Sequence, residues 1–128
     1  DFHFPLLRLP DIMLIYAEAV NELNAGPDAE AYRQINRIRT RANATPFSGM
    51  NQDEFRSAVL EERARELAYE ADRRYDLFRW GIYLDVMNAI DMDEHNVTKR
   101  RLERNLLYPI PTSEVNSNDK IDVNNPGW

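Results

Sequence analysis

The chain contains no cysteine. Disulfide bonds, thiolate metal sites and cysteine nucleophiles are therefore excluded within its 128 residues. A lipid-bearing cysteine is excluded as well, so a lipid anchor of that kind would have to lie outside this chain. Redox chemistry gives no indication of the compartment in which the protein works.

Long hydrophobic runs and an excess of positive charge are also absent. No apolar run approaches the roughly 20 residues needed to cross a bilayer, and the start, Asp1-Phe2-His3-Phe4, is acidic and aromatic, unlike a signal peptide. The net charge of -6 argues against a nucleic-acid partner, which requires a basic surface. The one basic run, Lys99-Arg100-Arg101, is interpreted as a solvated loop because acidic residues such as Glu103 surround it.

Histidine and glycine are scarce, which limits the possible chemistry. Only His3 and His95 could serve as general bases, and no Gly-x-Ser-x-Gly motif supplies a nucleophile. The four glycines are scattered, so no phosphate-binding loop precedes a helix. We therefore expect no catalytic residue and no cofactor.

Short metal-binding and glycosylation patterns carry little information here. Asp91-x-Asp93-Glu94 resembles the start of a calcium loop, but the glycine and the closing glutamate of such a loop are missing. The glycosylation sequons Asn43-Ala44-Thr45 and Asn96-Val97-Thr98 belong to a pattern that arises often by chance. No metal site is predicted.

What the sequence does contain is helical periodicity. Residues 10–42 predict a helical hairpin about as long as a tetratricopeptide unit, in which Pro10 fits the first turn and Gly26-Pro27 ends the first helix. Asp28 is expected to cap the second helix. The expected apolar stripes are Ile12, Ile15, Tyr16, Ala19 and Leu23 on the first helix and Ala31, Ile35, Ile38 and Ala42 on the second.

A long helical segment is predicted over residues 51–90. Asn51 and Glu54 form a capping-box pattern at its start. Within it, residues 60–81 contain no proline and no internal glycine, and their apolar stripe comprises Leu60, Ala64, Leu67, Ala71, Tyr75 and Phe78. A single rod over residues 52–79 would be roughly 40 Å long, so a break is expected near residues 71–73.

Residues 91–128 predict an irregular tail. Pro109 and Pro111 favour extended backbone before them, and a short helical turn is expected at residues 112–115. The fold class is therefore all-α, with tetratricopeptide-like helical hairpins and a long irregular C-terminal tail. We expect residues 1–128 to form a single domain, since a chain of this length can bury a core.

Residues 60–81 also carry a charged face. Its carboxylates offer the separations of a glycosidase pair. Arginines such as Arg63, Arg73 and Arg74 alternate with them and favour their ionised form, so an ion-pair network that braces neighbouring helices is the preferred interpretation. The expected network comprises Glu62, Arg63, Glu66, Glu70, Arg73 and Asp76, with arginines such as Arg39 as further partners.

Four aromatic residues are candidates for stacking against sugar rings. Trp80 and Tyr83 lie three residues apart near a helix end, and Tyr108 and Trp128 lie in the tail. Packing inside the protein is the alternative, since a domain of this size buries most of its aromatic side chains. The ligand-binding residues stay unknown at this point, with Trp80 and Tyr83 as candidates.

Four motifs, in order along the chain, resemble those of the RagB/SusD family. Residues 8–19 resemble its R-x-x-D-x-x-L-x-x-A-E-A helix, and residues 36–42 match N-x-I-R-x-R-A. Residues 62–81 resemble E-R-x-x-E-L-x-x-E-G-x-R-x-x-D-L-x-R-W-G. Tyr108-Pro109-Ile110-Pro111, Glu114 and Asn125-Pro126-Gly127-Trp128 resemble the Y-P-I-P...E...N-P-G-Y ending. Together the motifs cover nearly the whole chain.

This sequence departs from the family pattern at three neighbouring positions. Ala71 stands where the family usually has glycine, Asp72 where histidine or asparagine is common, and Arg74 where tryptophan is frequent. The alanine weakens the expectation of a sharp corner at this point.

The resemblance implies the C-terminal portion of a surface-exposed outer-membrane lipoprotein that captures glycans or other nutrients. It implies a SusC-like TonB-dependent transporter as partner, no catalysis, and a signal peptide and lipid anchor outside this chain. Two alternatives stay open. One is a protein-binding helical module without a sugar site of its own, and the other is a carboxylate-using hydrolase.

Overall fold

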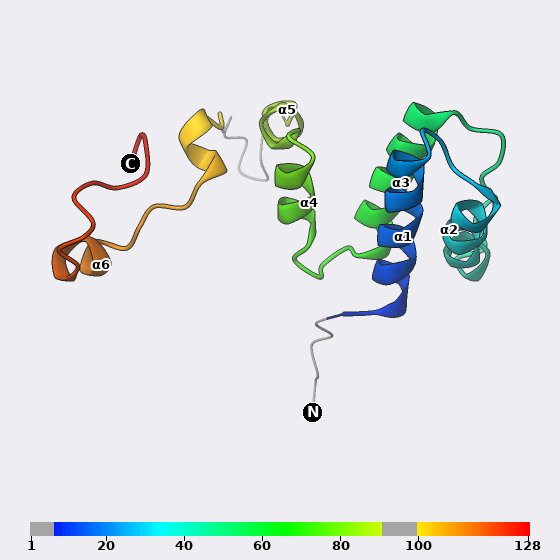
Figure 1. Ribbon diagram of the computed structural model, residues 1–128, viewed down its shortest axis with the longest axis horizontal. Helices are drawn as coiled ribbons and strands as arrows, with labels where there is room; N and C mark the ends of the chain where they lie inside the picture. The colour runs from blue at the N-terminus through cyan, green and yellow to red at the C-terminus, as the bar shows by residue number, and fades with distance from the viewer. Residues whose placement is uncertain (1–6, 91–99) are drawn as a thin grey trace. The chain divides into compact units, whose positions relative to one another are not determined.

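The computed structural model describes residues 7–90 and 100–128 (Figure 1). Its elements are α1 (Leu9–Leu23), α2 (Ala29–Arg41), α3 (Gln52–Glu66), α4 (Arg73–Arg79), α5 (Tyr83–Asn88), the 3-10 helix η1 (Glu103–Leu106) and α6 (Thr112–Ser117). No strand occurs in these two ranges, and the predicted all-α fold with tetratricopeptide-like hairpins is confirmed.

Two compact units make up the chain, Asp1–Arg73 and Arg74–Trp128. That the two units form a single domain stays a prediction. Within the described ranges, no helix is both long enough and apolar enough to cross a membrane.

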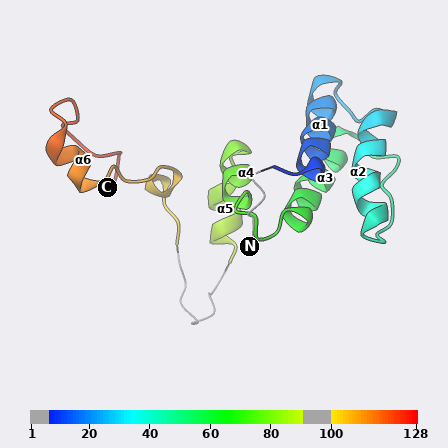
Figure 2. The same cartoon turned by 90° about the horizontal axis from the view of Figure 1, so that it is seen from below.

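In the first unit, α1 packs against both α2 and α3 (Figures 1 and 2). α1 and α3 run antiparallel, because the end of α1 meets the start of α3. There the Asn21 side-chain amide donates to the Gln52 backbone carbonyl at 3.0 Å, and the Gln52 side-chain amide donates to the Asn21 backbone carbonyl at 3.2 Å. Asn21 is fully buried, so these bonds satisfy polar groups that water cannot reach.

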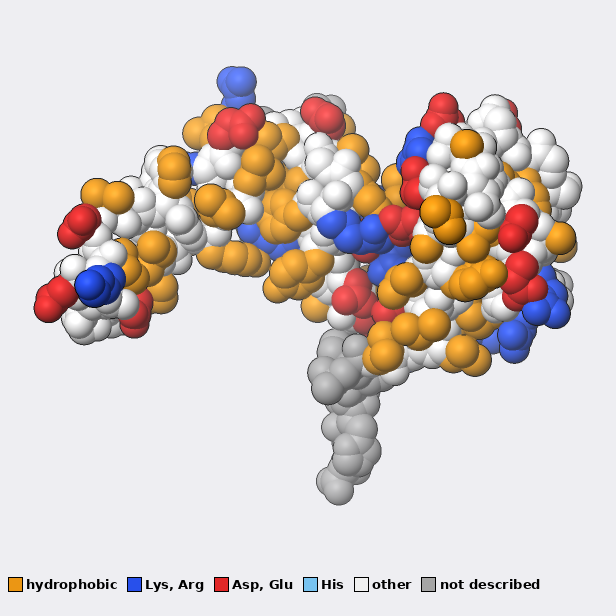
Figure 3. Space-filling view, in the orientation of Figure 1, with side chains coloured by type: hydrophobic (Ala, Val, Ile, Leu, Met, Phe, Trp, Pro, Cys, Tyr) orange, Lys and Arg blue, Asp and Glu red, His pale blue; other side chains and the backbone are white. Residues whose placement is uncertain are grey.

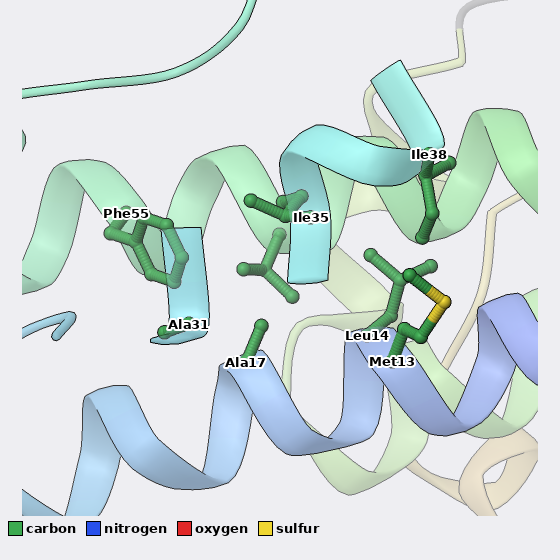
Figure 4. Close-up of a cluster of buried hydrophobic side chains, with 8 residues drawn as sticks. Met13, Leu14, Ala17, Ala31, Ile35, Ile38 and Phe55 are labelled. Atoms are coloured by element: carbon green, nitrogen blue, oxygen red, sulfur yellow. The ribbon is translucent and has the colours of Figure 1, made fainter. Parts of the chain in front are cut away.

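The core of this unit lies where the three helices meet (Figure 4). Its buried side chains are Met13, Leu14, Ala17, Ala31, Ile35, Ile38, Phe55 and Val59. Phe55 is the largest of those that are fully buried, and the Tyr32 ring meets it edge-on, with 5.0 Å between ring centroids. The three helices therefore share one core rather than packing as separate pairs.

The predicted apolar stripe of α1 is wrong. Ile12, Ile15 and Leu23 are 45%, 46% and 84% exposed, whereas Met13 and Leu14 on the neighbouring face are buried. α1 is apolar around most of its circumference, so helical periodicity marks two possible faces. Packing against α2 and α3 selects one of them.

Both predicted helix caps on α2 and α3 are confirmed. The Asp28 carboxylate accepts from the Ala31 backbone N–H at 2.7 Å. Asn51 and Glu54 form a capping box, in which the two reciprocal bonds measure 3.0 and 2.9 Å. The predicted stripe of α2 is also confirmed at Ala31, Ile35 and Ile38, while Ala42 is exposed at the helix end.

Residues 60–81 do not form one helix. α3 ends at Glu66 and α4 begins at Arg73, so the break covers residues 67–72 and starts earlier than expected. Tyr69 and Ala71 adopt positive φ angles of 67° and 69°. The stripe predicted across this segment fails beyond Leu67, since Tyr75 is 61% exposed. Alanine at position 71 takes the left-handed conformation that glycine would adopt more easily.

Ala71→Gly is expected to stabilise the protein. Glycine removes the strain of the left-handed conformation, which costs alanine about 1–2 kcal/mol. It also raises the conformational entropy of the unfolded chain, which opposes folding by about 0.4–1 kcal/mol. The free energy of unfolding should therefore rise by about 0.5–1 kcal/mol. Urea unfolding followed by circular dichroism measures it. Ala58→Gly, inside α3, is the matched control and should destabilise by about 1 kcal/mol. Equal losses in both variants would contradict the assignment of strain to Ala71.

The second unit contains α4, α5 and the tail. Apart from η1 and α6, the described tail is non-helical, as predicted. Asn124 joins two of its segments by exchanging hydrogen bonds with the Ile110 backbone at 2.8 and 2.9 Å. The Trp128 indole donates to the Arg104 carbonyl at 2.9 Å. None of the residues of α6 is buried, so the tail holds together mainly through such polar contacts.

Gly127 explains part of the terminal motif. Its φ angle is +86°, and a Cβ atom there would lie 2.8 Å from the Cβ of Arg104. Both the backbone conformation and the space therefore require glycine beside Arg104. The same arginine lies 5.2 Å from the Trp128 ring centroid, so the motif fixes the last aromatic side chain in place.

Candidate functional site

A cluster of ion pairs joins the start of α1 to the end of α3. The Arg8 guanidinium donates two hydrogen bonds to Glu70, at 2.8 and 2.6 Å. It also donates to the Glu66 carboxylate at 3.1 Å and to the Glu66 carbonyl at 2.9 Å. The hydrogen bonds that Arg8 donates to Glu70 raise the pKa of Arg8 above its ordinary value. Arg8 therefore ties together the two glutamates that the sequence placed on one charged face.

A second group of ion pairs joins α2 to α3. Glu62 is 4% exposed and accepts from Arg39 at 2.6 Å and from Arg65 at 3.2 Å. Arg41, near the end of α2, pairs with Glu66. Arg39 also donates to the Thr45 carbonyl at 2.6 Å, and its guanidinium lies 3.8 Å from the centroid of the Phe47 ring. This arginine thus fixes both α3 and the loop after α2.

The remaining members of the predicted network have further partners. Arg63 is 5% exposed and pairs with Asp11 of α1 at 2.8 Å. Arg73 donates to the Leu60 carbonyl at 3.4 Å, which is a weak hydrogen bond. In the second unit, Asp76 accepts from Arg79 at 2.9 Å within α4. Because Arg8 and Arg41 both pair with Glu66, the first two groups meet at this carboxylate, and Arg63 adds a further link between α1 and α3.

Arg8, Asp11 and Arg41 are residues of the site that sequence reasoning did not place in the network. All three belong to the motifs quoted above, where Arg8 and Asp11 are the first two defined positions of the R-x-x-D helix. The available signal was that two charged motif positions stand at the start of a helix whose first turns are otherwise mostly apolar. The partners of Arg8 and Asp11 lie more than 50 residues away in the sequence, so the pairing itself could not be read from spacing.

These contacts leave little room for acid–base chemistry on α3. The Glu62 and Glu66 side chains are only 5% and 9% exposed, and arginines from α1 or α2 bind both of them. A general acid must lie within hydrogen-bond reach of its substrate. Among the described residues, no group of three histidine, aspartate or glutamate side chains is placed to hold a metal ion.

The aromatic candidates lie in the second unit. Tyr83 is 4% exposed and packs against Phe78, with 4.4 Å between ring centroids. The Arg74 guanidinium lies 5.3 Å from the Tyr83 centroid and 4.5 Å from that of Tyr108. Trp80 is partly exposed, and Arg79 lies 4.5 Å from its ring centroid. Burial therefore argues against Tyr83 as a sugar platform, while Trp80 stays a candidate.

Several candidates lie outside the described residues. These are His3 and His95, the calcium-like residues 91–94, the sequon at residues 96–98, and Lys99 of the basic run.

Comparison with known proteins agrees with the motifs. A sequence model of the SusD family matches residues 2–128. The chain belongs to the SusD family. Its relatives include SusD-like protein P25 of Formosa agariphila, 40% identical over 96% of this chain, and starch-binding protein SusD of Bacteroides thetaiotaomicron, 34% identical over 97%. This SusD-family chain covers 24% and 21% of those relatives, about a quarter or less of their length.

Solved structures of the SusD family share this fold. A SusD homologue from Bacteroides thetaiotaomicron, 35% identical, matches 96% of this chain with a TM-score of 0.78. A SusD superfamily protein from Parabacteroides distasonis, 28% identical, matches 98% with a TM-score of 0.80. The match again covers only 26% and 27% of those chains. The resemblance inferred from the motifs is thus confirmed in both sequence and structure.

Proposed function

We propose that this chain is the C-terminal portion of a glycan- or nutrient-binding accessory protein of a SusC-like TonB-dependent transporter. The observation that carries the proposal is the family match over residues 2–128. The 34% identity to a starch-binding protein supports it. The protein would be exposed at the surface of the outer membrane, with its lipid anchor and signal peptide outside this chain. No nucleic acid takes part.

The arrangement of α1–α3 supports a binding role without catalysis. Ion pairs link charged side chains of α3 to partners at the start of α1 and on α2, and these pairs join the three helices into one unit. We propose that Glu62, Arg63, Glu66, Glu70, Arg73 and Asp76 serve this bracing role. A rigid scaffold of this kind can position a binding surface that lies elsewhere on the protein.

Titration of the protein at its full natural length against soluble glycans tests the proposal. The panel includes starch oligosaccharides, and isothermal calorimetry is the readout. We expect heat of binding with at least one glycan and no release of reducing ends. Copurification with a SusC-like transporter but no heat with any glycan would favour the protein-binding module instead. Glycan hydrolysis that disappeared in Glu66→Gln or Glu70→Gln would favour the hydrolase.

Trp80→Ala tests whether the more accessible member of the pair Trp80 and Tyr83 contributes to that binding. Loss of a stacking face is expected to weaken glycan affinity about tenfold. Tyr75→Ala is the matched control, since Tyr75 lies on α4, which ends directly before Trp80, and is 61% exposed, and it should leave the affinity unchanged. Unchanged affinity in both variants would exclude Trp80 as a stacking residue for the glycan.

A further inference from the structure

Three arginines form a row along the exposed face of α2. Arg33, Arg37 and Arg41 follow one another at intervals of four residues and are all exposed. Residues at this spacing lie on the same side of a helix, about 6 Å apart along its axis. Figure 3 shows basic side chains gathered where α2 lies in Figure 1. We call these three residues the arginine row.

An open hollow lies between the members of the arginine row. Its volume is about 510 Å³, and Asn36 and Thr40 complete its lining. Sites of roughly 300–1,000 Å³ take small molecules, with a few polar groups that fix the ligand's orientation. The Asn36 amide is already held by the Phe47 backbone, to which it donates at 2.9 Å and from which it accepts at 2.7 Å. The floor of the hollow is therefore fixed in position.

Arg37, the middle arginine of the row, interacts with Glu30 through charge attraction without forming an ion pair. Arg33 pairs with Glu30 at 2.5 Å, and Arg41 pairs with Glu66. No carboxylate in residues 7–90 or 100–128 forms an ion pair with Arg37. Like charges four residues apart destabilise a helix slightly. The ion pairs of Arg33 and Arg41 account for those two residues, whereas Arg37 has its guanidinium available to a ligand.

Arg39 on the same helix shows the contrast. Its side chain is 13% exposed and is engaged by Glu62, the Thr45 carbonyl and the Phe47 ring. Arg39 therefore has a structural role that is visible in its contacts. Arg37, two residues earlier, has none of these contacts and points to a different use.

We propose that the arginine row binds the anionic group of an acidic glycan, namely a sugar ring that carries a carboxylate or a sulfate. Guanidinium groups bind such planar or multi-oxygen anions through paired hydrogen bonds. A volume of about 510 Å³ accommodates one or two sugar rings. A specific protein interface instead requires an extended contact surface of about 800 Å² on each partner. The proposal rests on the proposed glycan-capture function and names a substrate class for it.

The net charge of the chain supports a localised site. The net charge of -6 on this chain opposes a general attraction of polyanions. Binding of an acidic glycan therefore has to depend on a cluster of cations rather than on general attraction. The salt dependence of such binding follows the number of ion pairs formed.

The test uses the protein at its full natural length and three oligosaccharides of equal length. These are an oligogalacturonate, a chondroitin sulfate oligosaccharide and a neutral malto-oligosaccharide, each titrated by isothermal calorimetry at low and high salt. We expect Arg37→Glu to weaken binding of at least one acidic oligosaccharide about tenfold or more. The carboxylate and sulfate arms distinguish the two anion types. Arg100→Glu, which makes the same charge change at an exposed site outside the row, should have little effect.

The outcomes separate this proposal from the proposed function. Binding of the neutral oligosaccharide with no binding of either acidic one overturns the arginine-row site and leaves glycan capture intact. Equal losses in Arg37→Glu and Arg100→Glu overturn it as well, because they show general charge attraction. A polyglutamate peptide that displaces the acidic oligosaccharide at equal or lower concentration would assign the row to an acidic protein segment instead. No binding of any oligosaccharide contradicts the proposed function itself.

Discussion

Glu62→Gln is expected to lower the free energy of unfolding by about 3 kcal/mol, the lower end of the range for breaking one half of a buried ion pair. Glu62 is 4% exposed, and its carboxylate accepts from Arg39 at 2.6 Å. The glutamine keeps the size of the side chain but removes the charge, so the Arg39 guanidinium, whose side chain is 13% exposed, loses its counter-charge. Urea unfolding at pH 7 followed by circular dichroism measures the loss.

Glu61→Gln is the matched control for this prediction. Glu61 is the preceding residue on α3, and its side chain is 64% exposed and pairs with Arg65 at 3.3 Å. An exposed pair contributes about 0–1 kcal/mol, so the control should change stability by less than 1 kcal/mol. A double-mutant cycle with Arg39→Gln then isolates the coupling between Glu62 and Arg39. Similar small losses for Glu61→Gln and Glu62→Gln would contradict a bracing role for Glu62.

Phe55→Ala is expected to destabilise the protein by about 3–5 kcal/mol, which is the usual cost of removing a buried aromatic ring. Phe55 is fully buried where α1, α2 and α3 meet, and it packs edge-on against Tyr32 (Figure 4). Its removal takes away the ring contact to Tyr32 of α2 and leaves a cavity in the core cluster. The same urea unfolding experiment measures the effect.

Phe55→Leu distinguishes cavity formation from a general loss of aromatic character. Leucine fills much of the same volume, so the loss should be under about 1.5 kcal/mol. A large difference between the two variants is the expected result. Equal losses would mean that the shape of the ring matters more than the filled volume, and would contradict the cavity explanation.

Much of the local structure could be predicted from the sequence, because short-range chemistry determines it. The side chains of Asp28 and Asn51 cap helices that begin within three residues of them. The stripe of α2 was predicted correctly since that helix has one clear apolar face among charged residues. The terminal Asn-Pro-Gly motif likewise indicated a turn, and Gly127 occupies a conformation that favours glycine.

The break within residues 60–81 does not follow from local helix propensity. Helix propensity favours continuation through Leu67 and Ala71, yet the chain turns there with positive φ angles. Arg8 donates hydrogen bonds to Glu66, the last residue of α3, and to Glu70, which lies inside the break. These two contacts fix the chain before and after the first turn of the break. A contact across roughly 60 residues can offset a local preference of a fraction of a kcal/mol per residue.

The sequence by itself determined the family, the helical class, the helix caps and the charged motif positions. Only the tertiary structure decided which face of α1 is buried and which arginine each glutamate binds. The physical reason is the same for both. α1 is apolar nearly all round, and the charged positions of α1, α2 and α3 offer many possible pairs. The antiparallel packing of α1 against α3, with α2 alongside, selects one face and one set of partners.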